Sequence, residues 1–205
     1  MSNVKLAVLY YSSTGTNYRM AQVAADGAKE AGAEVKVVRI AETAPEAAIA
    51  SNPEWKAHYE ATKDIVPVAT LDDLEWADAI LFSAPTRFGN MASQVKAFID
   101  TTGGLWFHGK LANKVVSGMT SAQNPNGGQE ATILSLYTTF YHWGSIVVAP
   151  GYTDPVLFQT GGNPYGLSVT AKGDGVIPDV YLEAAKHQAR RMVTVAGWVK
   201  NGQSK

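Results

Sequence analysis

Short apolar runs alternate with helix-patterned segments along this chain of 205 residues, and this alternation restricts the fold more than any other feature. The runs are almost continuously apolar and rich in Val, Ile and Leu, which is typical of strands covered on both faces of a parallel sheet. They are Leu6–Tyr10, Val35–Ile40, Ala79–Ser83, Val115–Met119 and Ile146–Val148. The order predicts an α/β fold, a doubly wound five-stranded parallel sheet with helices on both faces.

Two segments interrupt the alternation within what we expect to be a single domain over residues 1–205. Residues 41–65 contain the string Pro53-Glu-Trp-Lys-Ala-His-Tyr59 and are interpreted as an insertion with a short helix. Residues 150–178 are rich in Gly and Pro and have little periodicity. Ordered loops of that length are usually functional or part of an interface.

Charge and composition exclude several classes of function. Lys and Arg total 17 against 18 Asp and Glu, so a formal net charge of −1 predicts no nucleic-acid partner. Cysteine is absent, which excludes disulfides, thiolate nucleophiles and thiolate metal sites. The histidines are scattered, so we expect no metal site. No apolar run has the roughly 18 residues that a membrane span needs. The amino terminus leads directly into the first run without a signal peptide, and we therefore expect a cytoplasmic location.

The turn after the first apolar run is the strongest indication of a ligand. Its residues are Ser12, Ser13, Thr14, Gly15, Thr16 and Asn17. Hydroxyls and main-chain N–H groups at the start of a helix favour an anion such as a phosphate, and the turn itself contains no Lys or Arg. The same residues could instead only cap the helix, because Ser, Thr and Asn are good N-caps. The glycine patterns of P-loop and dinucleotide-binding turns are missing here.

Two later turns follow the third and fourth runs. One comprises Pro85, Thr86, Arg87, Phe88, Gly89 and Asn90, and the other contains Thr120, Ser121, Ala122, Gln123, Asn124, Gly127 and Gly128. Their aromatic, amide, hydroxyl and main-chain groups suit a flat heteroaromatic ring with a polar edge. Either could also be an ordinary surface turn. Because ligands bind at the carboxyl ends of parallel strands, the three turns together predict one pocket, a phosphate cup with two ring walls.

These turns resemble those of flavodoxin-fold FMN proteins, and in detail those of the WrbA-type NAD(P)H:quinone oxidoreductases. The strings that carry the resemblance are Leu9-Tyr-Tyr-Ser12, Pro85-Thr-Arg-Phe-Gly-Asn-Met91, Thr102-Gly-Gly-Leu-Trp106, Gly127-Gly-Gln-Glu130 and Gly161-Gly-Asn-Pro-Tyr-Gly166. They extend over most of the chain, and the insertion at residues 41–65 also has a counterpart in the family. The resemblance implies a flavodoxin-like sheet in the order 2-1-3-4-5.

The resemblance also implies FMN as bound cofactor. The turn Ser12–Asn17 would hold its phosphate, Thr86–Phe88 would contact the isoalloxazine, and Thr120–Gly128 would line its other edge. His142 matches a histidine beside the flavin, and Trp106 an aromatic that faces the substrate. Thr14 stands where relatives can carry a tyrosine that touches the nicotinamide. Judged without the family, Trp106 could be a packing tryptophan and His142 a core or interface histidine.

The implied activity is that of an FMN-dependent NAD(P)H dehydrogenase (quinone). Quinones would be reduced by two electrons in a ping-pong mechanism, and the flavin would carry the chemistry without a catalytic side chain. The resemblance implies a homotetramer, for which Trp55, Tyr59, Trp143 and the segment 150–178 are candidate interface residues. Two alternatives stay open. One is a flavodoxin-like one-electron carrier, although such carriers are usually strongly acidic; the other is a regulatory or scaffold protein without a cofactor.

Overall fold

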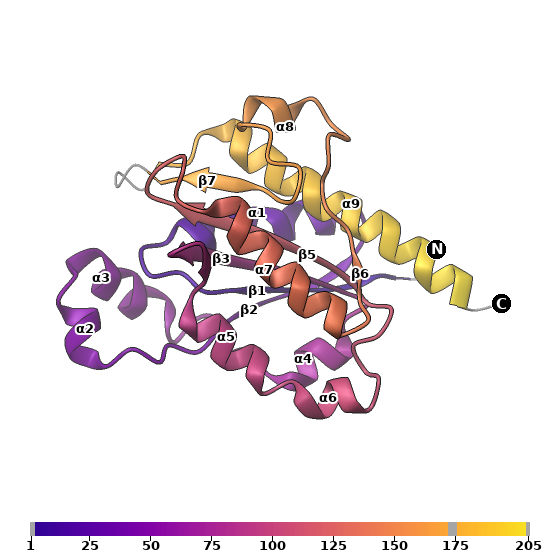
Figure 1. The fold of residues 1–205 in the computed structure, drawn as a ribbon, viewed down its shortest axis with the longest axis horizontal. Coiled ribbons are helices and arrows are strands. Elements are labelled where there is room, and N and C mark those ends of the chain that lie inside the picture. Colours follow the sequence, from indigo (N-terminus) through magenta and orange to yellow (C-terminus); the bar gives the residue numbers. More distant parts are fainter. Residues whose placement is uncertain (1–2, 172–175, 204–205) are drawn as a thin grey trace.

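All five apolar runs form parallel strands of one sheet in the computed structural model, which describes residues 3–171 and 176–203 (Figure 1). The strands are β1 (Lys5–Tyr10), β2 (Glu34–Arg39), β3 (Ala79–Arg87), β5 (Val115–Ala122) and β6 (Ile146–Val147). Their order in the sheet is β2-β1-β3-β5-β6. The predicted fold class and the order 2-1-3-4-5 are therefore confirmed.

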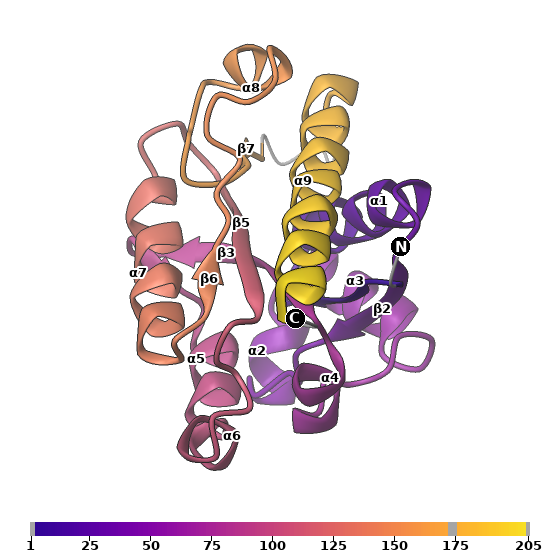
Figure 2. The same cartoon turned by 90° about the vertical axis from the view of Figure 1, so that its right-hand side faces the viewer.

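Helices cover both faces of the sheet, as Figure 2 shows with α1 and α9 on one side and α5 and α7 on the other. Side chains of each strand alternate between the two layers. Leu6 and Val8 pack with α1 (Thr16–Glu30) and α9 (Asp179–Gln203). Ala7 and Leu9 pack on the opposite face, among residues of α4 (Leu71–Trp76), α5 (Ser93–Asp100) and α7 (Gln129–His142).

The segment 41–65 contains two helices, α2 (Glu46–Ala50) and α3 (Pro53–Thr62), where we expected one short helix. The break between them has a local cause. Asn52 caps α3, since its side chain accepts hydrogen bonds from the main-chain N–H groups of Glu54 (3.0 Å) and Trp55 (3.2 Å). Pro53 follows in the first turn, where its missing N–H costs nothing. The pair of helices lies beside the carboxyl edge of the sheet (Figure 1).

Residues 150–178 contain more regular structure than their composition indicates. They form α8 (Val156–Gln159) and β7 (Ser168–Thr170), and residues 172–175 lie outside the described residues. β7 pairs in parallel with the carboxyl end of β5, which extends beyond the short β6. A further two-residue strand, β4 (Asn90–Met91), turns back on the end of β3. No helix in the described ranges is long and apolar enough to cross a membrane.

Candidate functional site

The carboxyl ends of β1, β3 and β5 surround a cleft of about 570 Å³. All three sequence-predicted turns contribute to it. The lining comprises Ser12, Ser13, Thr14, Thr16, Asn17, Pro85, Thr86, Arg87, Phe88, Ser121, Ala122, Gln123, Asn124 and Gly127, together with Asn52, Trp55 and Ala171. These last three residues were not predicted to line the site, and Asn52 and Trp55 come from the helical insertion.

The first turn leaves the amino end of α1 open toward this cleft. The N-cap residue is Gly15, in the left-handed conformation with φ 98°, and no side chain caps the helix. The hydroxyl of Ser12 accepts a hydrogen bond from the Gly15 N–H at 3.0 Å, inside the turn. The hydroxyl-rich turn therefore does not cap α1 through its side chains, which was the alternative interpretation. It can present hydroxyls and the positive end of a helix to an anion.

Asn17 ties the floor of the cleft to two strands. Its side-chain nitrogen donates to Ser121 Oγ at 2.7 Å, and the Ser83 hydroxyl lies within hydrogen-bond distance of the main-chain O of Asn17 (3.1 Å) and of its side-chain Oδ1 (3.3 Å). Asn17 is buried, and both the nitrogen and the oxygen of its side-chain amide have a partner. Its side chain therefore fixes α1 against β3 and β5, so that the turn above it has a rigid base.

Glu42, at the start of the insertion, was not predicted as a site residue, and it connects the insertion to the residue that precedes the first turn. Glu42 Oε2 accepts hydrogen bonds from the Tyr11 phenol (2.9 Å) and the Trp55 indole N–H (3.1 Å). Glu42 Oε1 accepts from the Gln94 amide (2.7 Å) and from the main-chain N–H groups of Thr43 and Ala44 (both 2.9 Å). Burial is the main reason that the pKa of the Tyr11 phenol is raised, and Glu42 adds to it, so the phenol stays a donor.

The turn between β3 and β4 forms one wall of the cleft, and its aromatic residue, Phe88, is exposed to solvent. Phe88 and Gly89 both have positive φ, 52° and 77°, as a tight two-residue hairpin turn requires. Phe88 is fully exposed, so a bulky residue holds a strained conformation without any packing that would compensate it. Arg87 leans back across the cleft, where its Nη2 donates to Ser13 Oγ at 3.0 Å.

The two walls meet behind the cleft through glycines. Gly128 has φ 87°, and a Cβ on it would lie 2.7 Å from Gly89 Cα. Thr132 Oγ1 donates to Thr86 Oγ1 at 2.6 Å across the same junction. Gly89 and Gly128 do not line the cleft, but they allow its walls to touch. Thr120 is also behind the surface, buried, with its hydroxyl donating to Ala84 O at 2.8 Å.

Trp106 and His142 lie together but away from the cleft of their own chain. The Trp106 indole donates to His142 O at 2.8 Å. α7 begins beside the cleft and has 14 residues, so His142 at its other end is about 20 Å away along the helix axis. Both residues therefore lie near the opposite edge of the sheet, where α6 (Gly103–Phe107) is drawn in Figure 1.

The position of Trp143 and the grouping of the possible metal ligands bear on two further expectations. Trp143 was a candidate for a subunit interface, but it is buried in the core with ring contacts to Phe82 (6.3 Å) and Phe140 (5.3 Å), so that interpretation was wrong. Within the described ranges, no three His, Asp or Glu side chains are grouped so that they could hold a metal ion.

A second cavity of about 770 Å³ lies on the other side of the loop that follows β5. Its lining includes Asn126, Glu130, Asn163 and Tyr181. It is larger than the cleft but contains none of the first or second turns. Both cavities lie at a helix start without a side-chain cap, α1 for the cleft and α7 for the second cavity. The cleft remains the better candidate because, among the described residues, it also has donors from the ends of three neighbouring strands.

Comparison with known proteins gives consistent results. Residues 4–153 match the family model described as NADPH-dependent FMN reductase. A protein of Deinococcus radiodurans named NAD(P)H dehydrogenase (quinone) is 58% identical over 190 residues, covering 93% of this chain and 94% of that protein. Another of the same name from Rhizobium rhizogenes is 44% identical over 198 residues, covering 94% and 96%. The solved structure of a flavodoxin, WrbA-like protein from Agrobacterium tumefaciens shares the fold, with a TM-score of 0.68 at 24% identity over 96% of this chain and 99% of that one.

Proposed function

This chain belongs to the NADPH-dependent FMN reductase family, and we propose that it binds FMN in the cleft at the carboxyl ends of β1, β3 and β5. It is an oxidoreductase, an FMN-dependent NAD(P)H dehydrogenase that reduces quinones, as its relatives' names and the near-complete coverage of both chains indicate. The family thus favours an enzyme over a one-electron carrier or a scaffold without cofactor.

The uncapped start of α1 is the observation that carries the proposed site. Ser12, Ser13, Thr14 and Thr16 line the cleft around it, and no side chain caps the helix. Among the described lining residues only Arg87 is a cation. A set of neutral donors with one guanidinium fits the monoester phosphate of FMN, and it lacks the acidic metal ligands that a magnesium-bound triphosphate needs.

The walls of the cleft suit the flat ring of the cofactor. The lining residues offer main-chain groups together with aromatic, amide and hydroxyl side chains; they are Thr86, Arg87 and Phe88 on one side and Ser121, Ala122, Gln123, Asn124 and Gly127 on the other. When bound, FMN supplies two-electron transfer from NAD(P)H to a quinone, and we infer ping-pong kinetics with one shared face for both substrates. The walls hold the ring in place, and their N–H groups favour negative charge on it.

A homotetramer is the proposed assembly, and the position of Trp106 and His142 supports it. Within one chain the two residues lie on the order of 20 Å from the cleft, judged from the length of α7. If they act on the flavin and the substrate, a second copy must supply them. Trp106, Phe107 and Tyr141 are 53%, 77% and 65% exposed, and this amount of exposed aromatic surface is typical of an interface. The single domain over residues 1–205 and the cytoplasmic location also remain proposals.

An absorbance titration tests the site and the reaction together. The purified protein should take up FMN with a change in the flavin spectrum, lose that spectrum on addition of NADH, and regain it when benzoquinone follows. Double-reciprocal plots should give parallel lines. Intersecting lines would contradict a shared site, and a protein that takes up no FMN would overturn the proposed site altogether.

Complementation between two variants tests the assembly. Trp106→Ala should reduce quinone turnover, and Thr14→Val with Thr16→Val should weaken FMN binding. Mixed and refolded together, the two inactive proteins should recover part of the activity, because some clefts then combine an intact cup with an intact tryptophan from another copy. A mixture without recovery, or a monomer in sedimentation at all concentrations, would contradict the proposal.

A further inference from the structure

Helix α3 of the insertion forms the back of the phosphate turn. The His58 imidazole lies against Gly15, with Nδ1 3.6 Å from the position that a Cβ on Gly15 would take. The same ring packs on Tyr18 of α1, with the ring centroids 5.5 Å apart. One helical turn earlier on α3, Trp55 lines the cleft itself. The insertion therefore places a histidine directly behind the residue that begins α1.

The imidazole has an unused nitrogen. His58 Nε2 is buried and has no hydrogen-bond partner among the residues that the structure describes. His58 lines a small pocket of about 20 Å³ together with Tyr10, whose hydroxyl is likewise buried and without a hydrogen-bond partner among the described residues. That volume holds one water molecule. A protonated imidazole would thus have a place for its second N–H without any rearrangement of α3.

Nearby charges do not set the protonation state in the empty protein, because burial is the cause that lowers the pKa of the His58 imidazole. Arg39 and Glu42 line the same pocket and carry opposite charges, and the Arg39 guanidinium donates to the carbonyls of Lys63 and Val66. The Glu42 carboxylate accepts the five hydrogen bonds described above. The other titratable side chains that line this pocket or contact the ring, among the described residues, are the phenols of Tyr10, Tyr11, Tyr18 and Tyr59. Of all these side chains only an imidazole ordinarily changes its charge between pH 5.5 and 8.

Burial lowers the pKa of the His58 imidazole in the chain without a ligand, so the ring is then neutral at pH 7. A phosphate monoester brings a charge of about −1.5 to −2 at that pH, and Arg87 is the one cation among the described residues that line the cleft. A negative charge placed near an imidazole favours the imidazolium. Resting on the proposed function, we propose that His58 takes up a proton from solvent when the phosphate of FMN occupies the cup.

The sign of the pH dependence follows from linkage. Below the pKa of the empty protein His58 is already charged, and above the pKa of the complex it stays neutral in both states. Between these values His58 takes up a proton on binding, so its contribution to the FMN affinity falls as the pH rises. The phosphate itself titrates with a pKa of about 6, and the comparison of the wild type with a His58 variant removes that contribution because both bind the same phosphate. A difference of one pKa unit corresponds to about tenfold in affinity. Riboflavin, which has the same ring and no phosphate, should not show this dependence.

Fluorescence titrations with FMN and riboflavin from pH 5.5 to 8 test the proposal. The ratio of FMN affinities between the wild type and His58→Gln should fall by about tenfold over this range, and the corresponding ratio for riboflavin should stay constant. The matched control is His108→Gln, because His108 is exposed in the loop after α6. Its FMN curve should follow the wild type. Parallel FMN curves for the wild type and His58→Gln would overturn the proposal while leaving the FMN site intact.

A second measurement needs no variant. In protein labelled with ¹³C-histidine, the imidazole pKa values are followed by NMR with FMN and then with riboflavin bound. One histidine should titrate at a higher pH with FMN than with riboflavin, since the two ligands differ only in the phosphate. Identical titrations of all histidines with both ligands would contradict proton uptake. A protein that binds neither flavin at any pH would instead overturn the proposed function.

Discussion

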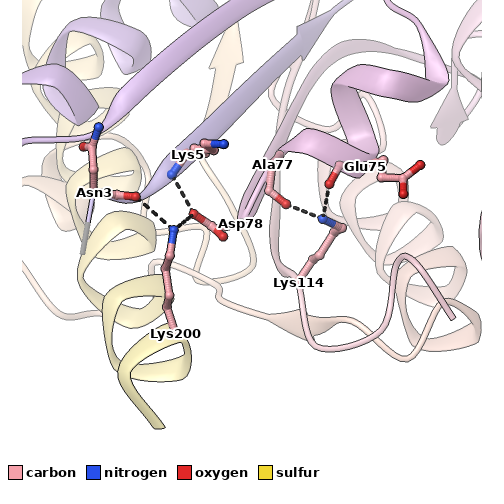
Figure 3. A network of polar contacts seen from close by, with 7 residues as sticks. All are labelled: Asn3, Lys5, Glu75, Ala77, Asp78, Lys114 and Lys200. Carbon is pink, nitrogen blue, oxygen red and sulfur yellow. Dashed lines mark hydrogen bonds and ion pairs between the residues drawn. The ribbon is translucent and has the colours of Figure 1, made fainter. Parts of the chain in front are cut away.

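The two ends of the parallel strands, called here the amino edge and the carboxyl edge of the sheet, use polar groups in opposite ways. At the amino edge the chain supplies both partners: Asp78 accepts hydrogen bonds from the Lys5 N–H at 2.9 Å and from Lys200 Nζ at 2.7 Å (Figure 3). Lys114 Nζ donates there to the main-chain carbonyls of Glu75 and Ala77, at the end of α4. At the carboxyl edge the turn after β1 leaves the start of α1 uncapped, beside an open cleft.

This contrast separates stability from binding. Polar groups that the chain pairs with itself stabilise the fold, and their loss should not disturb a ligand on the other side of the molecule. Groups that face the cleft contribute little to the folded chain alone, so they can be removed at low cost to stability and at high cost to affinity.

The largest expected effect is on FMN binding, in the double variant Thr14→Val and Thr16→Val. Valine keeps the shape of threonine and removes the hydroxyl. Two hydrogen bonds to a charged phosphate are together worth about 3 kcal/mol, so the affinity for FMN should fall about 100-fold in a fluorescence titration. The melting temperature should hardly change. An equal loss of affinity for riboflavin would show that these hydroxyls do not hold the phosphate.

The converse change is Asp78→Ala at the amino edge. It removes the acceptor of a main-chain and a lysine hydrogen bond, and urea unfolding should report a loss of about 2 kcal/mol in the free energy of unfolding. FMN affinity should stay within about twofold, because the cleft is at the other edge. Asp78→Asn is the matched control, since it can still accept from the Lys5 N–H and should lose about half as much. A large drop in FMN affinity would contradict the separation of stability from ligand binding.

A smaller effect is expected for Glu42→Gln. This variant tests the separation of stability from binding at a residue that the chain pairs with itself although it is close to the cleft. Glu42 is close to the cleft, yet both of its carboxylate oxygens accept hydrogen bonds within the chain, and its partners include Tyr11, which precedes the first turn, and Trp55, which lines the cleft. The amide turns one acceptor into a donor, so we expect a loss of about 1 kcal/mol in stability together with a several-fold weaker FMN affinity. Gln94→Met, which removes a partner of Glu42 outside the cleft, should reduce stability and spare the affinity.

Features that depend on local pattern were predictable from the sequence. The five strands are continuous apolar runs because helices cover both faces of the sheet, and three turns converge because parallel strands end at one edge. β4 and β7 were missed, since two or three residues such as Ser168–Thr170 carry no periodicity of their own. Their existence depends on the neighbouring strand that they pair with.

Features that depend on distant partners were not predictable. Glu42 is one of many acidic residues in the sequence, and only the fold brings Tyr11, Trp55 and Gln94 to it. Trp143 follows exposed residues at a helix end, yet it turns inward onto Phe82. The residue type shows that a tryptophan is large and mostly apolar, but it does not show whether the side chain points into the core or toward the surface.

The hydrogen bond of 3.0 Å from Lys200 Nζ to Asn3 O fastens the last helix to the first residues of the described chain, at the edge opposite the cleft (Figure 1, Figure 3). A tether fused near either end would therefore leave on the same side of the molecule. Attached in this way to an electrode or a bead, the protein would present its cleft outward to dissolved reactants.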